Sequence, residues 1–223
     1  MQQEGVDCDF FSSESWVILS PIEQSIKRKI EAVGTPLKDW DIQINYGIKT
    51  GLNDAFIINT EKRDEILANC LTEDERARTA ELIRPILRGR DIKRYGYNWA
   101  NLWLINIHNG IKGKLPRIDI NEYPAIKVHL DQYWNKIKDR MDQGDTPYNL
   151  RNCAYMEDFF KPKITWGNLN LKGTYSYVQK GMFINAPSPF IVTSNIAILH
   201  ILNSKIADYY IRSLGVTRNG GYF

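Results

Sequence analysis

The stretch NYGIKTGLNDAFII, residues 45–58, sets a polar and cationic turn between two apolar runs. Residues 42–44 lead into this turn and residues 55–58 lead out of it, and short apolar runs bounded by Gly, Asn and Asp are typical of strands. The two glycines permit backbone conformations that a side chain would forbid. We therefore predict a tight turn between two strands, where Lys49, Thr50 and Asn53 are placed to meet a phosphate or a base edge. A hairpin turn whose Asn and Gly only satisfy backbone geometry is the alternative interpretation.

Helix and strand signals alternate through the rest of the chain. Ser20-Pro21 combines a capping residue with a proline at the first helical position, which predicts a helix that ends at Gly34. Thr72 is expected to cap a helix over 73–83, with Glu75 as its capping-box partner and Pro85 as its stop. Further helices are expected over 63–68, 122–141 and 195–215, and further strands over 101–106, 163–166, 175–178, 182–184 and 190–193. This order predicts a mixed α/β (α+β) fold, in which a twisted sheet is flanked by helices.

The composition is that of an ordinary globular protein. The chain has 223 residues, of which 43% are hydrophobic, so it is long enough for one large or two small domains. Its net charge of +3 is too mild to establish nucleic-acid binding, and the argument therefore depends on where the cations cluster. Three widely spaced cysteines match neither a disulfide framework nor a zinc site. The sequence has no signal peptide and no long apolar run, so we expect a cytoplasmic protein with no membrane partner.

The sequence lacks the motifs of a catalytic or cofactor site. It has no glycine-rich cofactor loop and no Asn/Asp-Pro-Pro-Tyr/Phe motif of the kind that adenine methyltransferases use. The three histidines have no Cys or His partner at metal-ligand spacing. Gly47 to Gly51 matches a phosphate-binding loop only loosely, because the lysine precedes the second glycine. We therefore expect no catalytic, cofactor-binding or metal-binding residues in this chain.

A second cationic segment lies at 84–95, where five cations fall within eleven residues. Phosphate contacts need Lys or Arg, and base contacts favour Arg, Lys, Asn and Gln, so this segment is a candidate for contact with DNA. A solvated charged loop is the alternative. Lys163 is expected to line one side of a DNA cleft, and Arg218 belongs to a basic C-terminal tail that is also a candidate for DNA contact. The predicted contacts of the second segment are Arg88, Arg90, Lys93 and Arg94.

Three motifs, at 45–58, at 83–92 (IRPILRGRDI) and at 202–205 (LNSK), together resemble the TaqI-like C-terminal specificity domain. That family supplies the target-recognition part of bacterial adenine-specific DNA methyltransferases and of combined restriction-modification enzymes. The resemblance implies that residues 1–15 lead in from a missing N-terminal catalytic domain and that 16–223 form a target-recognition domain, truncated at its C-terminus. The turn at 143–147 is the best candidate for a boundary inside that domain, and one continuous unit fits the sequence equally well.

The resemblance also implies a function. The chain would recognise double-stranded DNA as the specificity domain of a type IIG-like restriction-modification enzyme or an adenine-specific DNA methyltransferase. Catalysis would belong to an N-terminal methyltransferase domain of the parent protein, with S-adenosylmethionine as cofactor and Mg²⁺ if the parent also cleaves DNA. The LNSK motif would be architectural. Two alternatives stay open, a complete small enzyme and a protein–protein docking module, and the second predicts an exposed apolar patch instead of a basic face.

Overall fold

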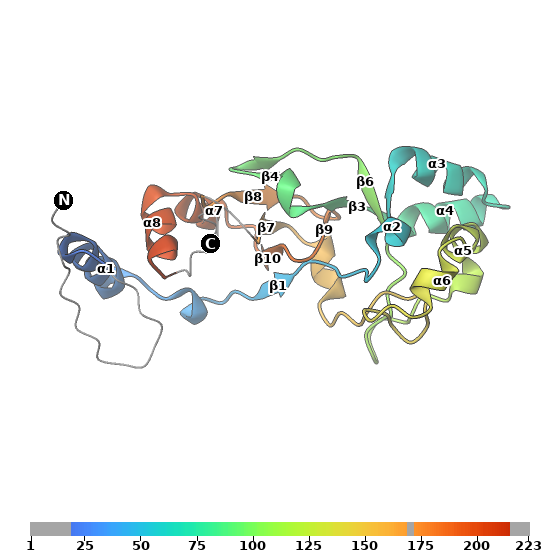
Figure 1. Cartoon of the computed structure of the whole chain (residues 1–223), viewed down its shortest axis with the longest axis horizontal. Helices are drawn as coiled ribbons and strands as arrows, with labels where there is room; N and C mark the ends of the chain where they lie inside the picture. The colour runs from blue at the N-terminus through green and yellow to red at the C-terminus, as the bar shows by residue number, and fades with distance from the viewer. Residues whose placement is uncertain (1–18, 169–171, 215–223) are drawn as a thin grey trace, which may run out of the picture.

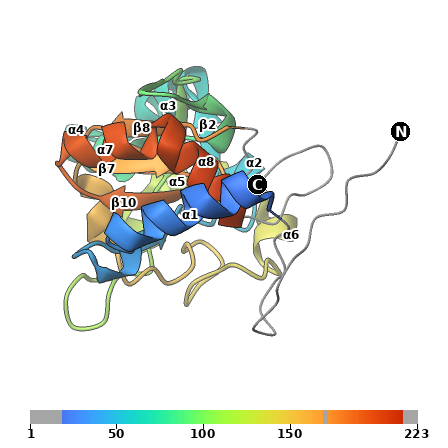
Figure 2. The same ribbon diagram turned by 90° about the vertical axis from the view of Figure 1, so that its left-hand side faces the viewer.

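The structure is a computed structural model that describes residues 19–168 and 172–214, and it is elongated (Figure 1). One antiparallel sheet and one mixed sheet occupy the middle of the long axis, and helices cover both ends. At one end, α1 (Pro21–Val33) runs beside α8 (Lys205–Leu214), as Figure 2 also shows. The opposite end is formed by α3 (Thr60–Ala68), α4 (Glu73–Leu82), α5 (Pro124–Asp131) and α6 (Trp134–Ile137).

The first sheet has the strand order β1-β10-β7-β8, and all its neighbouring strands are antiparallel. Ile44 pairs with Ile191, and Ile191 pairs in turn with Ile164. The next helix, α7 (Ile196–Leu202), packs its buried residues with this sheet in a small second core. The strands are β1 (Ile44–Tyr46), β10 (Pro189–Val192), β7 (Lys163–Trp166) and β8 (Tyr175–Val178).

The second sheet has the order β2-β6-β3-β9, with β3 and β9 parallel and the other pairs antiparallel. Strands from before and after the turn at 143–147 pair with each other in both sheets, because β1 pairs with β10 and β3 pairs with β9. The strands are β2 (Ile57–Asn59), β6 (Leu102–Ile105), β3 (Ile83–Leu87) and β9 (Phe183–Ile184), and a separate hairpin joins β4 (Ile92–Lys93) to β5 (Gly96–Tyr97).

The larger hydrophobic core lies around the second sheet and extends into the helical end. The rings of Phe159 and Phe183 stack with their centroids 4.7 Å apart, and both side chains are fully buried. Short 3-10 turns complete the chain: η1 (Leu37–Asp39), η2 (Gly89–Asp91), η3 (Ile120–Glu122) and η4 (Met156–Phe160). The mixed α/β fold with flanking helices is confirmed.

The helix starts predicted from capping residues are confirmed at two places. The Ser20 side chain accepts a hydrogen bond from the Glu23 amide, while the Glu23 carboxylate accepts one from the Ser20 amide. Thr72 caps α4 in the same way, through the Glu75 amide. The predicted capping box at α4 is wrong, because the Glu75 carboxylate accepts from the amides of Leu71 and Ala125 instead. Glu75 therefore ties α4 to the start of α5.

The expected ends of several elements are also wrong. Residues 53–56 form a short helix, α2 (Asn53–Phe56), so the chain becomes extended only at Ile57 and the turn at 47–52 does not close a hairpin. The helix expected up to Ile83 ends at Leu82, and Pro85 lies inside β3 opposite Trp103. The long helix expected over 122–141 is divided into η3, α5 and α6.

The final helix, expected to be continuous, breaks at Asn203. The Asn203 side chain is buried, donates to the carbonyl of Tyr175 at 2.9 Å, and accepts from the amide of Tyr175 at 3.1 Å. Asn203 thus pairs with the backbone of β8 as a neighbouring strand would. Ser204 then accepts from the amide of Ala207 and begins α8. These contacts make the break between α7 and α8 a consequence of pairing with a distant strand.

Candidate functional site

The turn at 47–52 is held by the loop that follows β9. The amide of Ile48 donates to the carbonyl of Ile184 at 2.7 Å. A Cβ atom at Gly47 would lie 2.5 Å from the backbone carbonyl carbon of Asn185, so the two backbones approach each other too closely for a side chain. This contact fixes the position of Lys49, which is exposed to solvent.

Thr50 and Asn53 make the turn internally rigid. Thr50 is 2% exposed, and its hydroxyl donates to the side-chain oxygen of Asn53 at 2.7 Å and accepts from the amide of Leu52 at 3.2 Å. Its buried hydroxyl is therefore occupied within the turn. Asn53 remains exposed, so its amide group faces solvent at the start of α2.

Arg140 connects the turn to the segment at 142–149. Its buried guanidinium donates to the backbone carbonyls of Thr50, Asp142, Pro147 and Asn149 and lies over the ring of Phe56. Burial lowers the pKa of Arg140 to about 10, and the nearby Asp142 opposes this shift, so the side chain stays protonated at neutral pH. The four carbonyls satisfy a charge that would otherwise be costly to bury.

The second cationic segment meets the same loop after β9. The amide of Asn185 donates to the carbonyl of Leu87 at 2.8 Å, and a Cβ atom at Gly89 would lie 2.9 Å from the hydroxyl of Ser188. The two segments that were singled out in the sequence are thus brought together by residues 185–188. This connecting loop was not predicted as part of a site, and its only sequence signal is the pair of prolines at 187 and 189.

Arg88 and Asp91 form a bidentate pair inside this segment. The guanidinium of Arg88 donates to the two carboxylate oxygens of Asp91 at 3.0 and 2.8 Å, and the Arg88 amide donates to the same carboxylate at 2.9 Å. Burial raises the pKa of Asp91, but the bonds from Arg88 outweigh burial and leave this pKa below its usual range. The Arg88 guanidinium is therefore engaged in closing the turn, which is a structural role that the prediction of DNA contact did not include.

The other cations of this segment differ in how free they are. Arg90 is exposed, and its side chain forms no hydrogen bond or ion pair with any residue in the described ranges. Lys93 is exposed and donates to the carbonyl of Arg90 at 2.9 Å. Arg94 donates to the carbonyl of Asn203 at 2.6 Å and so is tied to the break between α7 and α8.

Lys163 does not line a surface cleft, and this expectation is corrected. The side chain is 0% exposed, and its ammonium donates to the carbonyls of Phe159 at 2.8 Å and Met182 at 3.2 Å. Burial lowers the pKa of Lys163 to about 8, with Asp158 opposing the shift. β7 lies between two other strands of its sheet, and Lys163, Ile164 and Thr165 are all buried, so both faces of the strand are covered at this position. Arg218 lies outside the described residues.

Four hollows on the surface share lining residues in succession, and we call the set of four the groove. The first hollow is lined by 109–117, Asp145 and 152–154, and it has a volume of about 800 Å³. The second hollow is lined by 46–49 and 151–155, so it shares 152–154 with the first. The third, lined by 48–53 and Asp142, shares residues 48 and 49 with the second. The fourth, around Arg90 and Lys93, meets the third at Pro187.

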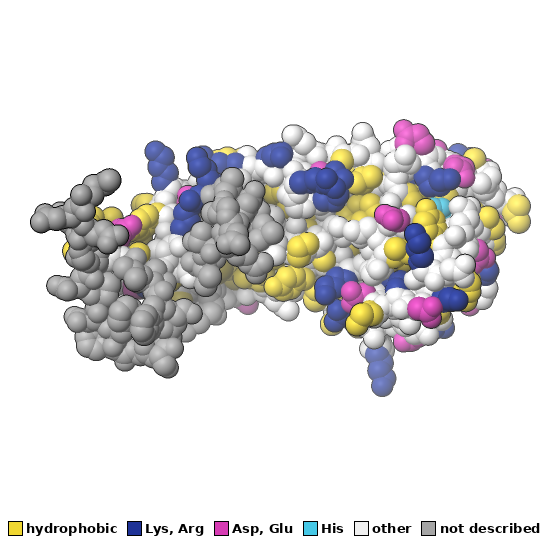
Figure 3. All heavy atoms as spheres, viewed as in Figure 1, with side chains coloured by type: hydrophobic (Ala, Val, Ile, Leu, Met, Phe, Trp, Pro, Cys, Tyr) yellow, Lys and Arg dark blue, Asp and Glu magenta, His cyan; other side chains and the backbone are white. Residues whose placement is uncertain are grey.

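Positive charge dominates the groove. Among the described residues that line the four hollows, the acids are Asp142 and Asp145. Acidic side chains gather instead toward the end formed by α3 to α6, on the right of the face drawn in Figure 3. The cations of the groove are Lys49, Arg90, Lys93, Lys112, Lys114, Arg117 and Arg151. Four of these, at 112, 114, 117 and 151, were not identified from the sequence, although three of them fall within the six residues 112–117.

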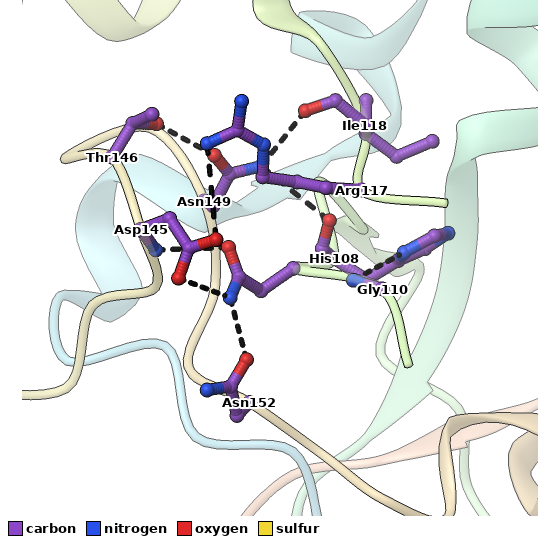
Figure 4. A network of polar contacts seen from close by, with 9 residues as sticks. His108, Gly110, Arg117, Ile118, Asp145, Thr146, Asn149 and Asn152 are labelled. Carbon is purple, nitrogen blue, oxygen red and sulfur yellow. Dashed lines mark hydrogen bonds and ion pairs between the residues drawn. The ribbon is translucent and has the colours of Figure 1, made fainter. Parts of the chain in front are cut away.

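A polar network connects two of the loops that line the groove (Figure 4). The Asn149 side chain donates to the carbonyl of Ile118 at 2.9 Å and accepts from the hydroxyl of Thr146 at 2.6 Å. His108 is buried, which lowers its pKa, and its ring nitrogen Nδ1 accepts from the amide of Gly110 at 3.2 Å. A neutral His108 with an unprotonated Nδ1 therefore fits this site.

The described residues contain no group of three or more His, Cys, Asp or Glu side chains suited to holding a metal ion. None of the helices within 19–168 and 172–214 combines the length and the apolar character that crossing a bilayer requires. Besides the rigid turns and the cationic groove, the described surface exposes apolar side chains on α1 and α8, among them Ile22, Val33 and Ile206.

The chain is similar to known proteins in sequence and in fold. The sequence model of the TaqI-like C-terminal specificity domain matches residues 84–223, a range that contains nearly all of the second motif and all of the third. A chain in the structure of the type IIL restriction-modification enzyme MmeI in complex with DNA is similar in fold, with a TM-score of 0.52 and 13% sequence identity. The similarity covers 77% of this chain and 21% of the MmeI chain, so the present chain spans about a fifth of that enzyme's length. No curated protein matches the chain.

Proposed function

The chain belongs to the family of TaqI-like C-terminal specificity domains, and we propose that its groove holds double-stranded DNA and that its turns read the base sequence. The observation that carries the proposal is the groove itself, in which seven cations and two acids line four adjoining hollows among the described residues. Duplex DNA carries a dense row of phosphates, and a protein binds it by neutralising several of them with Lys and Arg. The neighbour MmeI, whose structure contains DNA, supports the choice of partner.

Base reading is assigned to Lys49, Asn53 and Arg90. All three are exposed, and all three sit on turns that backbone hydrogen bonds or close glycine contacts hold in place. Arg pairs well with the major-groove edge of guanine, and Asn pairs well with that of adenine, while a flexible lysine can reach either a base or a phosphate. A rigid turn limits the ordering that binding requires, so more of the contact energy appears as affinity.

Phosphate contact is assigned to Lys93 and Arg151, which lie beside these turns in the same groove. Arg88, Arg94 and Thr50 are assigned a supporting role, because their polar groups are already bonded to Asp91, Asn203 and Asn53. A phosphate contact positions the duplex without reading sequence, whereas the base contacts specify it.

The parent protein is proposed to be a type IIG-like restriction-modification enzyme or an adenine-specific DNA methyltransferase. In it a methyltransferase domain would extrude the target adenine from the duplex, while the present domain selects the site. S-adenosylmethionine would bind to that catalytic domain, as would Mg²⁺ if the enzyme also cleaves. The present chain would then supply specificity and part of the affinity.

Selection of bound duplexes from a random library by the purified chain, at low and at moderate salt, tests the proposal. We expect an enriched motif of a few base pairs. Arg90→Ala and Asn53→Ala should each relax the preference at individual positions, by about 1–3 kcal/mol for a lost bidentate contact. Arg28→Ala, an exposed arginine on α1 outside the groove, is the matched control and should leave the motif unchanged.

Two results would count against the proposal. Salt-sensitive retention of duplexes without an enriched motif would refute base reading by this chain and leave only backbone contact. Absence of retention at any salt would refute DNA binding by the isolated chain, and it would favour a protein–protein docking module.

A further inference from the structure

A hairpin-like loop at 109–117 projects from the end of the groove, and we call it the lysine finger. The amides of Leu115 and Lys114 donate to the carbonyl of Ile111, each at 2.9 Å, and the Ile111 amide donates to the carbonyl of Leu115 at 2.8 Å. These bonds close a tight turn whose tip is Gly113, at a φ of +74°. The finger is therefore a folded unit and not an open loop.

The root of the finger is as constrained as its tip. Gly110 has a φ of +73°, and a Cβ atom there would lie 2.4 Å from the carbonyl oxygen of Leu115. The amide group of Asn109 donates to the side chains of Asp145, at 2.9 Å, and Asn152, while its oxygen accepts from the Asp145 amide at 2.9 Å. Figure 4 shows Asp145 and Asn152 converging on this root from the neighbouring loop. Such anchoring fixes the direction in which the tip projects.

Among the described residues, the cations of the finger are either unpaired or only weakly paired with surface carboxylates, so an anionic ligand can bind to them in place of those carboxylates. Lys112 is exposed and forms no hydrogen bond or ion pair with the residues that the structure describes. Lys114 pairs with Glu157 on the surface, and the guanidinium of Arg117 lies 4.0 Å from Asp145. Exposed pairs of this kind contribute little to stability, so a stronger polyanion can displace the carboxylates at small cost.

The spread of cations over the four hollows favours a long polyanion as the partner. The finger lines the first hollow of this succession, and Arg90 and Lys93 line the fourth. A small anion would need only one of these hollows. A duplex lying along the groove brings phosphates to both ends at once, which matches cations spread over all four hollows.

We infer that the lysine finger is a second DNA-contacting element, which contacts the sugar–phosphate backbone through Lys112 and Lys114 while Lys49, Asn53 and Arg90 face the bases. This inference rests on the proposed function of the groove. The finger adds affinity independent of sequence, because its lysines are point charges that contact phosphates. It also orients the duplex, since its rigid root leaves the tip in one place.

The salt dependence of binding tests the inference. Binding of a fluorescein-labelled duplex of fixed sequence is measured by anisotropy across salt concentrations for the whole chain and for the Lys112→Ala/Lys114→Ala variant. Each phosphate contact contributes about 0.9 to the slope of log K against log salt, so loss of two contacts should reduce the slope by about 1.8. Raising the salt from 50 to 200 mM lowers the affinity of both proteins, and the factor by which it lowers the affinity of the variant should be about ten times smaller than the factor for the unaltered chain.

The matched control is Lys136→Ala/Lys138→Ala, which removes two exposed lysines outside the groove. These lysines have the same spacing as Lys112 and Lys114, and they lie in α6 and directly after it. This variant should retain the full slope. Equal slopes for the finger variant and this control would overturn the inference. Circular dichroism of each variant confirms that the loss does not come from unfolding.

A second substitution probes the ion pair. Glu157→Gln removes the carboxylate that competes with phosphate for Lys114, so it should tighten binding to the duplex. In a chain that already carries Lys114→Ala, Glu157→Gln should have a smaller effect. Equal effects in the two backgrounds would refute the role of Lys114.

The two proposals fail in different ways. If the unaltered chain does not bind the duplex at any salt, the proposed function fails, and the finger inference fails with it. If the unaltered chain binds with a steep salt slope and the finger variant behaves identically, only the finger inference fails.

Discussion

Replacement of Lys163 by methionine should change how the stability of the fold depends on pH. Lys163 has an ordinary pKa of 10.5 when unfolded, and burial lowers its pKa to about 8 in the folded chain. Between these values the unfolded chain holds a proton that the folded chain has released. Stability therefore rises with pH through this window in the unaltered protein, and methionine removes that rise.

The size of the effect follows from the displacement of the pKa. One unit corresponds to about 1.4 kcal/mol, so a displacement of this size corresponds to about 3 kcal/mol between neutral pH and pH 10.5. Methionine also leaves the carbonyls of Phe159 and Met182 without their donor. That loss shifts the free energy of unfolding of the variant by an amount that does not vary with pH. The slope of the free energy of unfolding against pH therefore reports the titration of Lys163.

Urea unfolding followed by circular dichroism, at intervals from pH 7 to pH 10, measures the difference between the unaltered chain and Lys163→Met. We expect the unaltered chain to gain stability relative to the variant as pH rises above about 8. Lys161→Met removes an exposed neighbouring lysine and should show no such change over this range. Parallel curves for the unaltered chain and Lys163→Met would refute the lowered pKa of a buried Lys163 amine.

Three further predictions test the contacts that hold the groove together. Asn203→Ala removes both hydrogen bonds to the backbone of Tyr175 and should destabilise the fold by about 2–4 kcal/mol, measured by urea unfolding. Asp91→Asn removes the carboxylate whose pKa Arg88 holds low despite burial. That stabilisation is complete above the unfolded pKa of about 3.9 and is lost as pH falls through the folded pKa, so the variant should lose less stability between pH 5 and pH 2 than the unaltered chain. Gly47→Ala forces a Cβ atom to 2.5 Å from the facing backbone, and it should lower both the melting temperature and the affinity for DNA; an unchanged melting temperature would contradict the close approach.

Part of the site could be predicted from the sequence because its signals are local. The cationic turns at 47–53 and 84–95 were found from residue type and spacing, and the structure places Lys49, Asn53, Arg90 and Lys93 at adjoining hollows. The role of Arg88 was not predictable in full. Its pairing with Asp91 depends on a 3-10 turn at 89–91, and a charged pair three residues apart is compatible with several backbone conformations.

The lysine finger has a local signal, three cations within 112–117, which was overlooked, whereas the loop at 185–188 has no charged residue. Each acquires its position only from neighbours far along the chain. The Asn109 side chain meets Asp145, and Gly47 packs on residues near 185, so both contacts join residues that sequence spacing does not connect. A single sequence contains no signal for such contacts.

The amino-acid sequence by itself determined the helix starts at Ser20 and Thr72, the mixed fold class and the family, because caps, turns and motifs depend on bonds within a few residues. The location of Lys163 in the core and the break at Asn203 were settled by tertiary structure. Whether a strand residue faces solvent depends on which strands lie beside it and what covers the sheet. A helix ends early when a side chain gains more from pairing with a distant strand than from one further helical turn. Both the burial of Lys163 and the helix break at Asn203 depend on burial and hydrogen bonding between segments far apart in sequence, and these contacts form only when the chain folds.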